Sequence, residues 1–188
     1  MKPDYGSLSD GDLATLSVSG SDAAYAEIVR RHRNHVYRLI HGNVGDADEA
    51  LDLTQEAFVS AHRALRRYDP GRPMRSWLAA IALNKCRDWA RRRTVRRFFT
   101  FARPIDDVVE AVADEGPDQA ALAADRQELA RLRREIAALP ATLREPLVLH
   151  TIEGMSQAET AAILSISEKA VETRLRRARI RLAERIGR

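Results

Sequence analysis

A C-terminal run of this 188-residue chain carries side chains that can read DNA bases. Arginine can donate two hydrogen bonds to guanine, and a carboxylate can accept one from the amino group of cytosine. Apolar residues recur along the run at the spacing of one helical face, at Val171, Leu175, Ala178 and Leu182. The opposite face carries Lys169, Glu172, Thr173, Arg176 and Arg179. We predict a helix whose polar face enters the major groove; a solvated charged helix of an ordinary bundle is the alternative.

Glu172 is the acid on this otherwise basic and polar face. A carboxylate repels phosphate, so its role must lie elsewhere. It can accept a hydrogen bond from cytosine, or it can pair with Arg176 four residues further along the same helix. Both readings remain open, whereas Arg176 is predicted to contact guanine or phosphate.

Two aromatic residues flank a turn rich in proline and glycine. Unstacked bases bind to flat aromatic rings that have a cation nearby to neutralise phosphate. Tyr68 and Trp77 supply the rings, and the helix expected to follow supplies Asn84, Lys85, Asp88, Arg91 and Arg92. This arrangement indicates binding of single-stranded nucleic acid. Packing in the core is the alternative for Trp77 and the favoured role for Trp89.

Enzymatic and metal-dependent functions find little support in the sequence. The five histidines form no HExxH motif, there is no glycine-rich phosphate loop, and the carboxylates fall on helix faces or in a linker. His32 and His35 lie three apart on one helix without a further ligand cluster near them, so they are expected to be partly exposed side chains and not metal ligands. The single cysteine, Cys86, has no activating neighbour and is expected to be buried. We expect no catalytic residue, no metal ligand and no cofactor.

The elements that would position these residues are all helical. Apolar stripes predict one helix from residue 23 that ends at Gly42 and Gly45. A second runs from Asp46 or Asp48 to about residue 67, and a third begins near Arg75 or Ser76 and continues into an arginine-rich block. Residues before 23 look loosely ordered apart from a short helix at 10–16. Three amphipathic helices can close a small bundle.

The C-terminal part predicts a helix-turn-helix. One helix restarts near Asp125 and stops at Pro140. Capping-box spacings at 142–145 and 156–159 open two more helices, and the first of these places Pro146 in its first turn. Residues 165–167 form a tight break before the last helix, over 168–186. A short helix, a brief break and a longer basic helix are typical of this DNA-binding motif.

Charge is segregated along the chain. Residues 87–103 hold seven arginines and one acid, whereas residues 104–124 hold six acids and no lysine or arginine. The pattern predicts an all-α chain of two small helical domains joined by an acidic flexible linker. The boundaries are an N-terminal segment 1–22, a first domain 23–98, a linker 99–126 and a second domain 127–188. The chain has no signal-peptide or membrane-spanning pattern, which predicts a cytoplasmic protein without membrane insertion.

Several segments together resemble bacterial RNA polymerase sigma factors of the sigma-70 family, most closely the two-domain extracytoplasmic-function group. In the first domain the similar segments are Asp52-Leu-Thr-Gln-Glu-Ala-Phe58, Tyr68-Asp-Pro, and Arg75-Ser-Trp-Leu-Ala-Ala-Ile-Ala-Leu-Asn84 with the arginines after it. In the second they are Leu147-Val-Leu149, Glu153-Gly-Met-Ser-Gln-Ala-Glu159 and Arg174-Leu-Arg-Arg-Ala-Arg179. The resemblance covers nearly everything from residue 23 onward.

The resemblance implies a role for each surface. Asp52, Gln55 and Glu56 would bind the RNA polymerase core enzyme. The loop at 68–76, including Arg75, and the helix after it would hold the non-template strand of the minus-ten element. The final helix, with Arg177 added to its polar face, would read the minus-thirty-five element of promoter DNA. An anti-sigma factor is an expected further partner.

Five positions depart from the family pattern. Ser165 stands where glycine is frequent in the turn, so any positive φ there must be adopted by serine. Lys169-Ala170 replaces a common Gly-Thr, Glu172 replaces a frequent basic residue, and Met74 replaces an aromatic residue of the melting loop. The functional alternative is a helix-turn-helix regulator that does not engage core polymerase.

Overall fold

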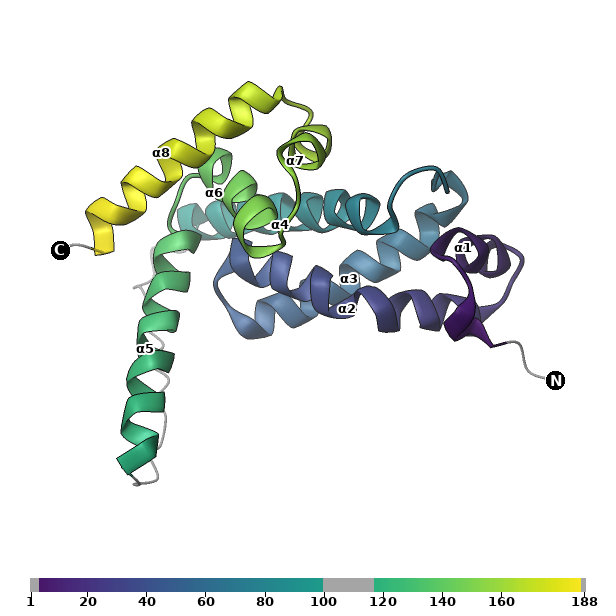
Figure 1. Ribbon diagram of the computed structural model, residues 1–188, viewed down its shortest axis with the longest axis horizontal. Helices are drawn as coiled ribbons and strands as arrows, with labels where there is room; N and C mark the ends of the chain where they lie inside the picture. The colour runs from purple at the N-terminus through teal and green to yellow at the C-terminus, as the bar shows by residue number, and fades with distance from the viewer. Residues whose placement is uncertain (1–3, 100–116, 187–188) are drawn as a thin grey trace.

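The computed structural model describes residues 4–99 and 117–186, with side chains for 4–96 and 127–186. All regular elements within these ranges are helical, which confirms the expected fold class (Figure 1). In chain order they are η1 (Tyr5–Ser7), α1 (Asp10–Val18), α2 (Asp22–Val44), α3 (Ala47–Ala64), η2 (Leu65–Arg67), α4 (Met74–Phe99), α5 (Pro117–Ala137), α6 (Ala141–Leu147), η3 (Val148–Ile152), α7 (Gln157–Leu164) and α8 (Glu168–Ile186).

Helices α2, α3 and α4 pack against one another as the predicted bundle. The apolar stripe of the predicted second helix is buried along its whole length, at Ala50, Thr54, Ala57, Phe58 and Ala61 of α3 and at Leu65 of η2. Trp89 is buried as well, and its indole Nε1 donates a hydrogen bond to the Glu49 carboxylate at 2.7 Å. The apolar periodicity therefore identified the inner face correctly.

The N-terminal segment is more ordered than its serine and glycine content suggested. Ser9 and Asp12 form a reciprocal capping box that opens α1, and Leu13 of this helix is fully buried. Arg31 of α2 donates hydrogen bonds to backbone carbonyls of the segment before α1, at 2.8 Å to Leu8 and 2.9 Å to Tyr5. Helix α1 is thereby part of the first bundle.

Of the two glycines predicted to end the first long helix, Gly45 closes α2, with a φ of +79°, whereas Gly42 lies inside the helix, which continues to Val44. Gly42 instead allows a close approach. A Cβ atom there would lie 3.1 Å from a methyl carbon of Val148, which belongs to η3 in the second half of the chain. The glycine thus lets two distant segments pack closely inside a regular helix.

Helix α5 begins at Pro117, well before the restart expected near Asp125. The linker predicted over 99–126 therefore contains the first part of a helix, and its residues 100–116 lie outside the described residues. In Figure 1, α5 extends away from the other helices before the chain turns into α6.

The capping box expected at Thr142 and Glu145 is not formed. Helix α6 begins at Ala141 behind Pro140, which provides no side-chain cap, and the Glu145 side chain is buried and paired with Arg87 of α4. Pro146 consequently lies in the interior of α6 and not in its first turn. Proline cannot donate a hydrogen bond to the preceding turn, and the chain widens into the π-helical turn η3 directly afterwards.

The helix-turn-helix follows the prediction closely. Ser156 and Glu159 form the second capping box and open α7. Ser165 adopts the left-handed conformation, with φ 55°, in place of a glycine. Helix α8 spans 168–186 as expected, and its stripe residues Val171, Leu175 and Ala178 are buried.

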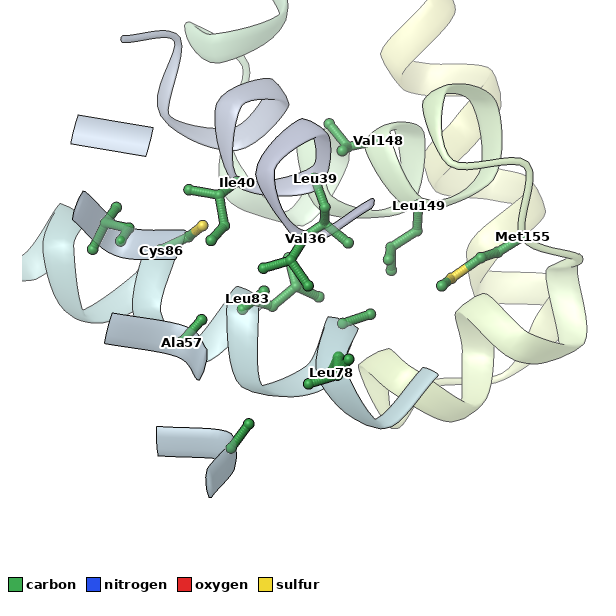
Figure 2. Close-up of a cluster of buried hydrophobic side chains, with 14 of the residues drawn as sticks. Val36, Leu39, Ile40, Ala57, Leu78, Leu83, Cys86, Val148, Leu149 and Met155 are labelled. Atoms are coloured by element: carbon green, nitrogen blue, oxygen red, sulfur yellow. The ribbon is translucent and has the colours of Figure 1, made fainter. Parts of the chain in front are cut away.

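One apolar core joins the two halves of the chain. Figure 2 shows side chains of both halves gathered in one cluster. Val36, Leu39, Leu78 and Leu83 come from α2 and α4, and Val148, Leu149 and Met155 come from η3 and the segment after it. The second domain is therefore packed onto the first.

Candidate functional site

Helix α3 presents its polar face at an open hollow of about 480 Å³. The hollow is lined by Asp52, Gln55, Glu56, Val59, Ser60, Arg63 and Lys85. The three residues predicted to bind polymerase therefore lie together and are exposed. Leu51 and Val59 on the same helix are about half exposed, at 53% and 50%. These two apolar side chains were not predicted as part of the binding face. Their position outside the buried stripe of the helix could have indicated it.

Two basic residues predicted to contact DNA lie beside this acidic face. The Lys85 ammonium is 3.5 Å from the Glu56 carboxylate, and a guanidinium nitrogen of Arg92 is 3.9 Å from the same oxygen. Both pairs are partly exposed, so they contribute little to stability. The α3 face and the basic face of α4 are therefore adjacent surfaces.

The loop between η2 and α4 is shaped by Tyr68. This residue is 9% exposed, and its hydroxyl donates a hydrogen bond of 2.7 Å to the Arg72 carbonyl. The Tyr68 and Trp77 ring centres are 5.2 Å apart, and Trp77 is the more accessible of the two. Burial, with the charges of Asp10 and Asp69 adding to it, raises the pKa of Tyr68. Tyr68 thus braces the loop while Trp77 keeps part of its ring accessible.

Met74 occupies the position where the family often has an aromatic residue. It is 2% exposed and belongs to the core, so in this conformation it does not present a side chain at the loop surface. Of the two described aromatic residues at this loop, Trp77, in the first turn of α4, is then the more accessible.

Further along α4, the predicted polar residues share an exposed surface with internal contacts. Asp88 accepts a hydrogen bond from Arg91. Asn84 accepts one from Arg87 at 3.3 Å. Because Arg91 and Asn84 remain exposed, they stay available to a nucleic acid.

Arg75 is placed differently from the other loop residues. Its guanidinium reaches across to Glu153, donating to the backbone carbonyl and lying 3.3 Å from the carboxylate. His35 and Arg38 contact the same carboxylate. His35 is 6% exposed, so the expectation of partly exposed histidines is wrong there. No local pattern in the sequence marked Glu153 as the partner of these three side chains.

The polar face of α8 is open. Lys169, Glu172, Arg176, Arg177 and Arg179 are exposed, and Thr173 is half-buried with its hydroxyl donating to the Lys169 carbonyl at 2.9 Å. Glu172 pairs with Lys169, not with Arg176: the Lys169 ammonium lies 2.8 Å from the Glu172 carboxylate. The hydrogen bond from Lys169 lowers the pKa of Glu172.

Groups suited to covalent or metal chemistry do not converge in the described part of the chain. No cluster of three or more histidine, cysteine, aspartate or glutamate side chains is placed there to hold a metal ion. Cys86 is buried as expected, and burial raises its pKa to about 12, which leaves the thiol protonated. None of the described helices is both long and apolar enough to cross a membrane.

Family models match both halves of the chain. Sigma-70 region 2 matches residues 28–96, and sigma-70 region 4 matches residues 129–182. The RNA polymerase sigma factor CnrH of Cupriavidus metallidurans is 40% identical over 176 residues, which cover 93% of this chain and 92% of CnrH. The ECF RNA polymerase sigma factor SigM of Mycobacterium tuberculosis is 30% identical over 179 residues, covering 95% of this chain and 85% of SigM.

Solved structures agree with this relationship. CnrH in complex with the cytosolic domain of CnrY superposes with a TM-score of 0.70 at 35% identity, covering 95% of this chain and 97% of that one. The sigma factor RpoE of Bartonella quintana, bound to the anti-sigma factor NepR, shares the fold with a TM-score of 0.68 at 22% identity, covering 85% and 94%. The chain belongs to the extracytoplasmic-function group of the sigma-70 family of RNA polymerase sigma factors.

Proposed function

We propose that three surfaces of this sigma factor divide the work of promoter recognition. The proposal is supported by the different chemistry of the three surfaces. The α3 face is acidic and partly apolar. Helix α4 combines a partly accessible aromatic ring with basic side chains, and the α8 face is basic and polar. Each is accessible at the surface, although Trp77 also packs partly against the core. Each suits a different partner.

The α3 face fits the core enzyme. Asp52, Gln55 and Glu56 offer carboxylate and amide groups to a basic polymerase surface, and Leu51 and Val59 offer apolar area beside them. A central apolar contact with a polar surround is typical of protein interfaces.

The loop and α4 fit the melted minus-ten strand. Trp77 can stack on an unstacked base, and Arg91 and Arg92 can neutralise phosphates. Tyr68 acts by holding the loop in shape. Arg75 is assigned to the same strand, in competition with its contact to Glu153.

Helix α8 fits the major groove of the minus-thirty-five element. Lys169, Thr173 and Arg176 lie in the N-terminal half of the helix, which enters the groove in helix-turn-helix proteins. Arg177 and Arg179 are placed for phosphate contacts. Base contacts there give specificity, and phosphate contacts give affinity.

The chain itself contributes recognition and no catalytic group, because the polymerase carries out RNA synthesis. We infer that it acts in the cytoplasm, where the transcribed DNA lies. The complexes of CnrH with CnrY and of RpoE with NepR support a protein regulator of this chain as a further partner.

Charge reversal on α3 tests the polymerase assignment. Asp52→Lys with Glu56→Lys is expected to abolish binding to core enzyme in a pull-down and to leave the circular dichroism spectrum unchanged. The matched control is Glu128→Lys with Glu184→Lys, which makes the same change in net charge at exposed positions on α5 and α8. Unchanged core affinity of the α3 variant would refute the assignment.

A further inference from the structure

The Glu153 carboxylate joins the two domains. Its side chain has 0% exposure, and it lies between cations of the first domain. Arg38 donates to it from Nε and Nη2, each at 3.1 Å, and His35 Nδ1 contacts it as well. Arg75 Nη2 lies 3.3 Å from the same carboxylate. Three side chains from α2 and α4 thus converge on one buried acid of the second domain.

This arrangement matters because a buried carboxylate is stable only with its partners. Removing them leaves an unpaired charge in a dry site, which costs far more than a surface charge. If the domains separate, water can solvate Glu153 and the contact is lost without that penalty. Closure of the domains and pairing of Glu153 are therefore one event.

Other contacts across the same interface support closure. Arg87 of α4 makes a two-pronged ion pair with Glu145 of α6, at 2.8 and 2.6 Å. Planar, paired geometry of this kind gives a strong charge-assisted contact. Val148 lies against Gly42, as described above.

Arg75 is the residue that links closure to DNA. Its guanidinium donates to both the carbonyl and the carboxylate of Glu153. Arg75 Nη2 makes both contacts to Glu153, and Arg75 Nε donates to His35 Nδ1 at 3.2 Å. A DNA phosphate bound through two of the three guanidinium nitrogens must therefore displace at least one of these contacts.

We propose that Glu153 acts as an intramolecular competitor of promoter DNA: it holds Arg75 in the closed form, and binding of the minus-ten strand requires that contact to open. The inference rests on the proposed assignment of Arg75 to the minus-ten strand. In the closed form, the free protein would therefore bind the minus-ten strand less well than in the open form. Because coupling is reciprocal, DNA bound at Arg75 must also favour separation of the domains.

Two substitutions weaken the contact without removing a DNA-binding residue. Glu153→Gln keeps the size of the side chain and removes its charge. Arg38→Ala removes two of the hydrogen bonds to Glu153 and lies outside the surfaces assigned to DNA. Glu184→Gln is the control, because it removes an exposed carboxylate from the same domain.

Opening is measured on the full chain by small-angle X-ray scattering. Both Glu153→Gln and Arg38→Ala are expected to raise the radius of gyration, and Glu184→Gln is expected to leave it unchanged. The proposal that Glu153 holds the domains closed would be refuted if neither interface variant raised the radius of gyration, or if the control raised it equally. Circular dichroism identifies any variant that has lost helicity.

Competition is measured by fluorescence anisotropy with a single-stranded minus-ten oligonucleotide from a promoter that the holoenzyme transcribes. Glu153→Gln is expected to bind it roughly tenfold more tightly, a change of about 1.4 kcal/mol. The gain should disappear when Arg75→Ala is added. If Glu153→Gln raises the radius of gyration but does not bind the oligonucleotide more tightly, Glu153 does not compete with DNA for Arg75. Arg75 would then not belong to the minus-ten surface. The α3 assignment would still stand on its own core-binding test.

Discussion

Side chains of the same chemical type have different roles because their neighbours differ. Trp77 and Trp89 lie on the same helix, yet Trp89 is 8% exposed and bonded to Glu49, whereas Trp77 is only partly covered by Tyr68. Lys169 and Arg176 lie on one face of α8, but only Lys169 is bonded to Glu172. The contribution of each residue to DNA binding therefore depends on the contact it must give up.

Trp77→Ala tests the stacking role. Loss of an aromatic partner costs ~1–3 kcal/mol per stacked base. Open-complex formation by the holoenzyme should therefore fall more on duplex promoter DNA than on DNA with a pre-melted minus-ten region, since the latter no longer needs base capture to drive melting. The measurement is the rate and yield of open complex on both templates.

The fold must be followed in the same experiment. Truncation of a half-buried tryptophan also lowers the stability of the domain, because packing is lost. A thermal melt separates the two effects. Equal defects on both templates, with a lowered melting temperature, would assign Trp77 to packing.

Substitutions on α8 test base reading. Arg176→Ala should weaken binding to the best minus-thirty-five site by ~1–3 kcal/mol if the guanidinium contacts a base in two places.

Glu172→Ala should relax the preference at one base pair and leave overall affinity unchanged, because its exposed pair with Lys169 contributes little. Binding of the holoenzyme to all single-base variants of the element provides the measurement. If the preference profiles of Glu172→Ala and the unmodified protein coincide, pairing with Lys169 is the whole role of Glu172.

At the scale of elements, the turn between α7 and α8 determines how the reading helix is presented. Ser165 caps α7 in the left-handed region, and its N–H lies 3.4 Å from the Ala162 carbonyl. Ser167 then accepts a hydrogen bond of 3.2 Å from the Ala170 N–H and so opens α8. Two serines with opposite backbone requirements thus make the break between the helices.

Ser165→Gly is expected to stabilise the protein. The left-handed conformation costs an L-residue about 1–2 kcal/mol, and glycine avoids that cost. The greater freedom of glycine in the unfolded chain offsets part of the gain, which leaves a net increase of about 0.5–1 kcal/mol. Chemical denaturation at neutral pH measures the free energy of unfolding.

Ser167→Gly is the matched control. It removes the hydroxyl that opens α8 and should lower stability by about a few tenths of a kcal/mol. If Ser165→Gly shows the same loss as Ser167→Gly, the turn gains nothing from a residue that adopts positive φ easily.

At the scale of the whole molecule, the two domains form one body through a shared apolar core and two buried acids. Val148 and Leu149 of η3 are fully buried against the first domain, and Glu145 and Glu153 receive their cations from it. The predicted two-domain organisation is present, but the domains are docked in the free chain. The π-helical turn η3, which follows Pro146, contacts α2, as do α5 and α6.

Acid is expected to open this arrangement. Burial by itself raises the pKa of the Glu153 carboxyl, but hydrogen bonds and positive charge from His35 and Arg38 outweigh it and leave the pKa below its ordinary value. Arg75 of α4 faces the same carboxylate. In the open form the carboxyl regains its ordinary pKa, so the open form binds the proton more readily. Closure is thus favoured above the ordinary glutamate pKa and is lost as the pH falls through the lowered value.

Small-angle scattering between neutral and acid pH measures this opening. The radius of gyration should rise on acidification in the unmodified protein, and Glu153→Gln should already be open at neutral pH with a weaker dependence. A pH dependence of the same size in both proteins would assign the titration to another group.

Local patterns in the sequence were sufficient for most of the helices and for the surfaces that face outward, but not for the start of α5 or the cap of α6. The stripe on α3, the stripe on α8, the capping box at Ser156 and the positive φ at Ser165 each follow from residues within a few positions of one another. Helical periodicity and capping are local properties, so they can be read without knowing what the helix contacts. The resemblance to sigma factors rested on the same short segments and is confirmed.

Contacts between distant segments were decided only by the tertiary structure. Glu153 and His35 are 118 positions apart, and nothing near either residue marks the other as its partner. Gly42 was read as a helix end because its local effect is to weaken a helix, whereas its use here is to admit Val148 from the other domain. Glu145 fits a capping box by spacing, but its pairing with Arg87 draws it into the interface. Where a residue has both a local helix or capping preference and a buried contact with a distant segment, the distant contact decides its role. Burial makes that contact contribute more free energy than the local preference does.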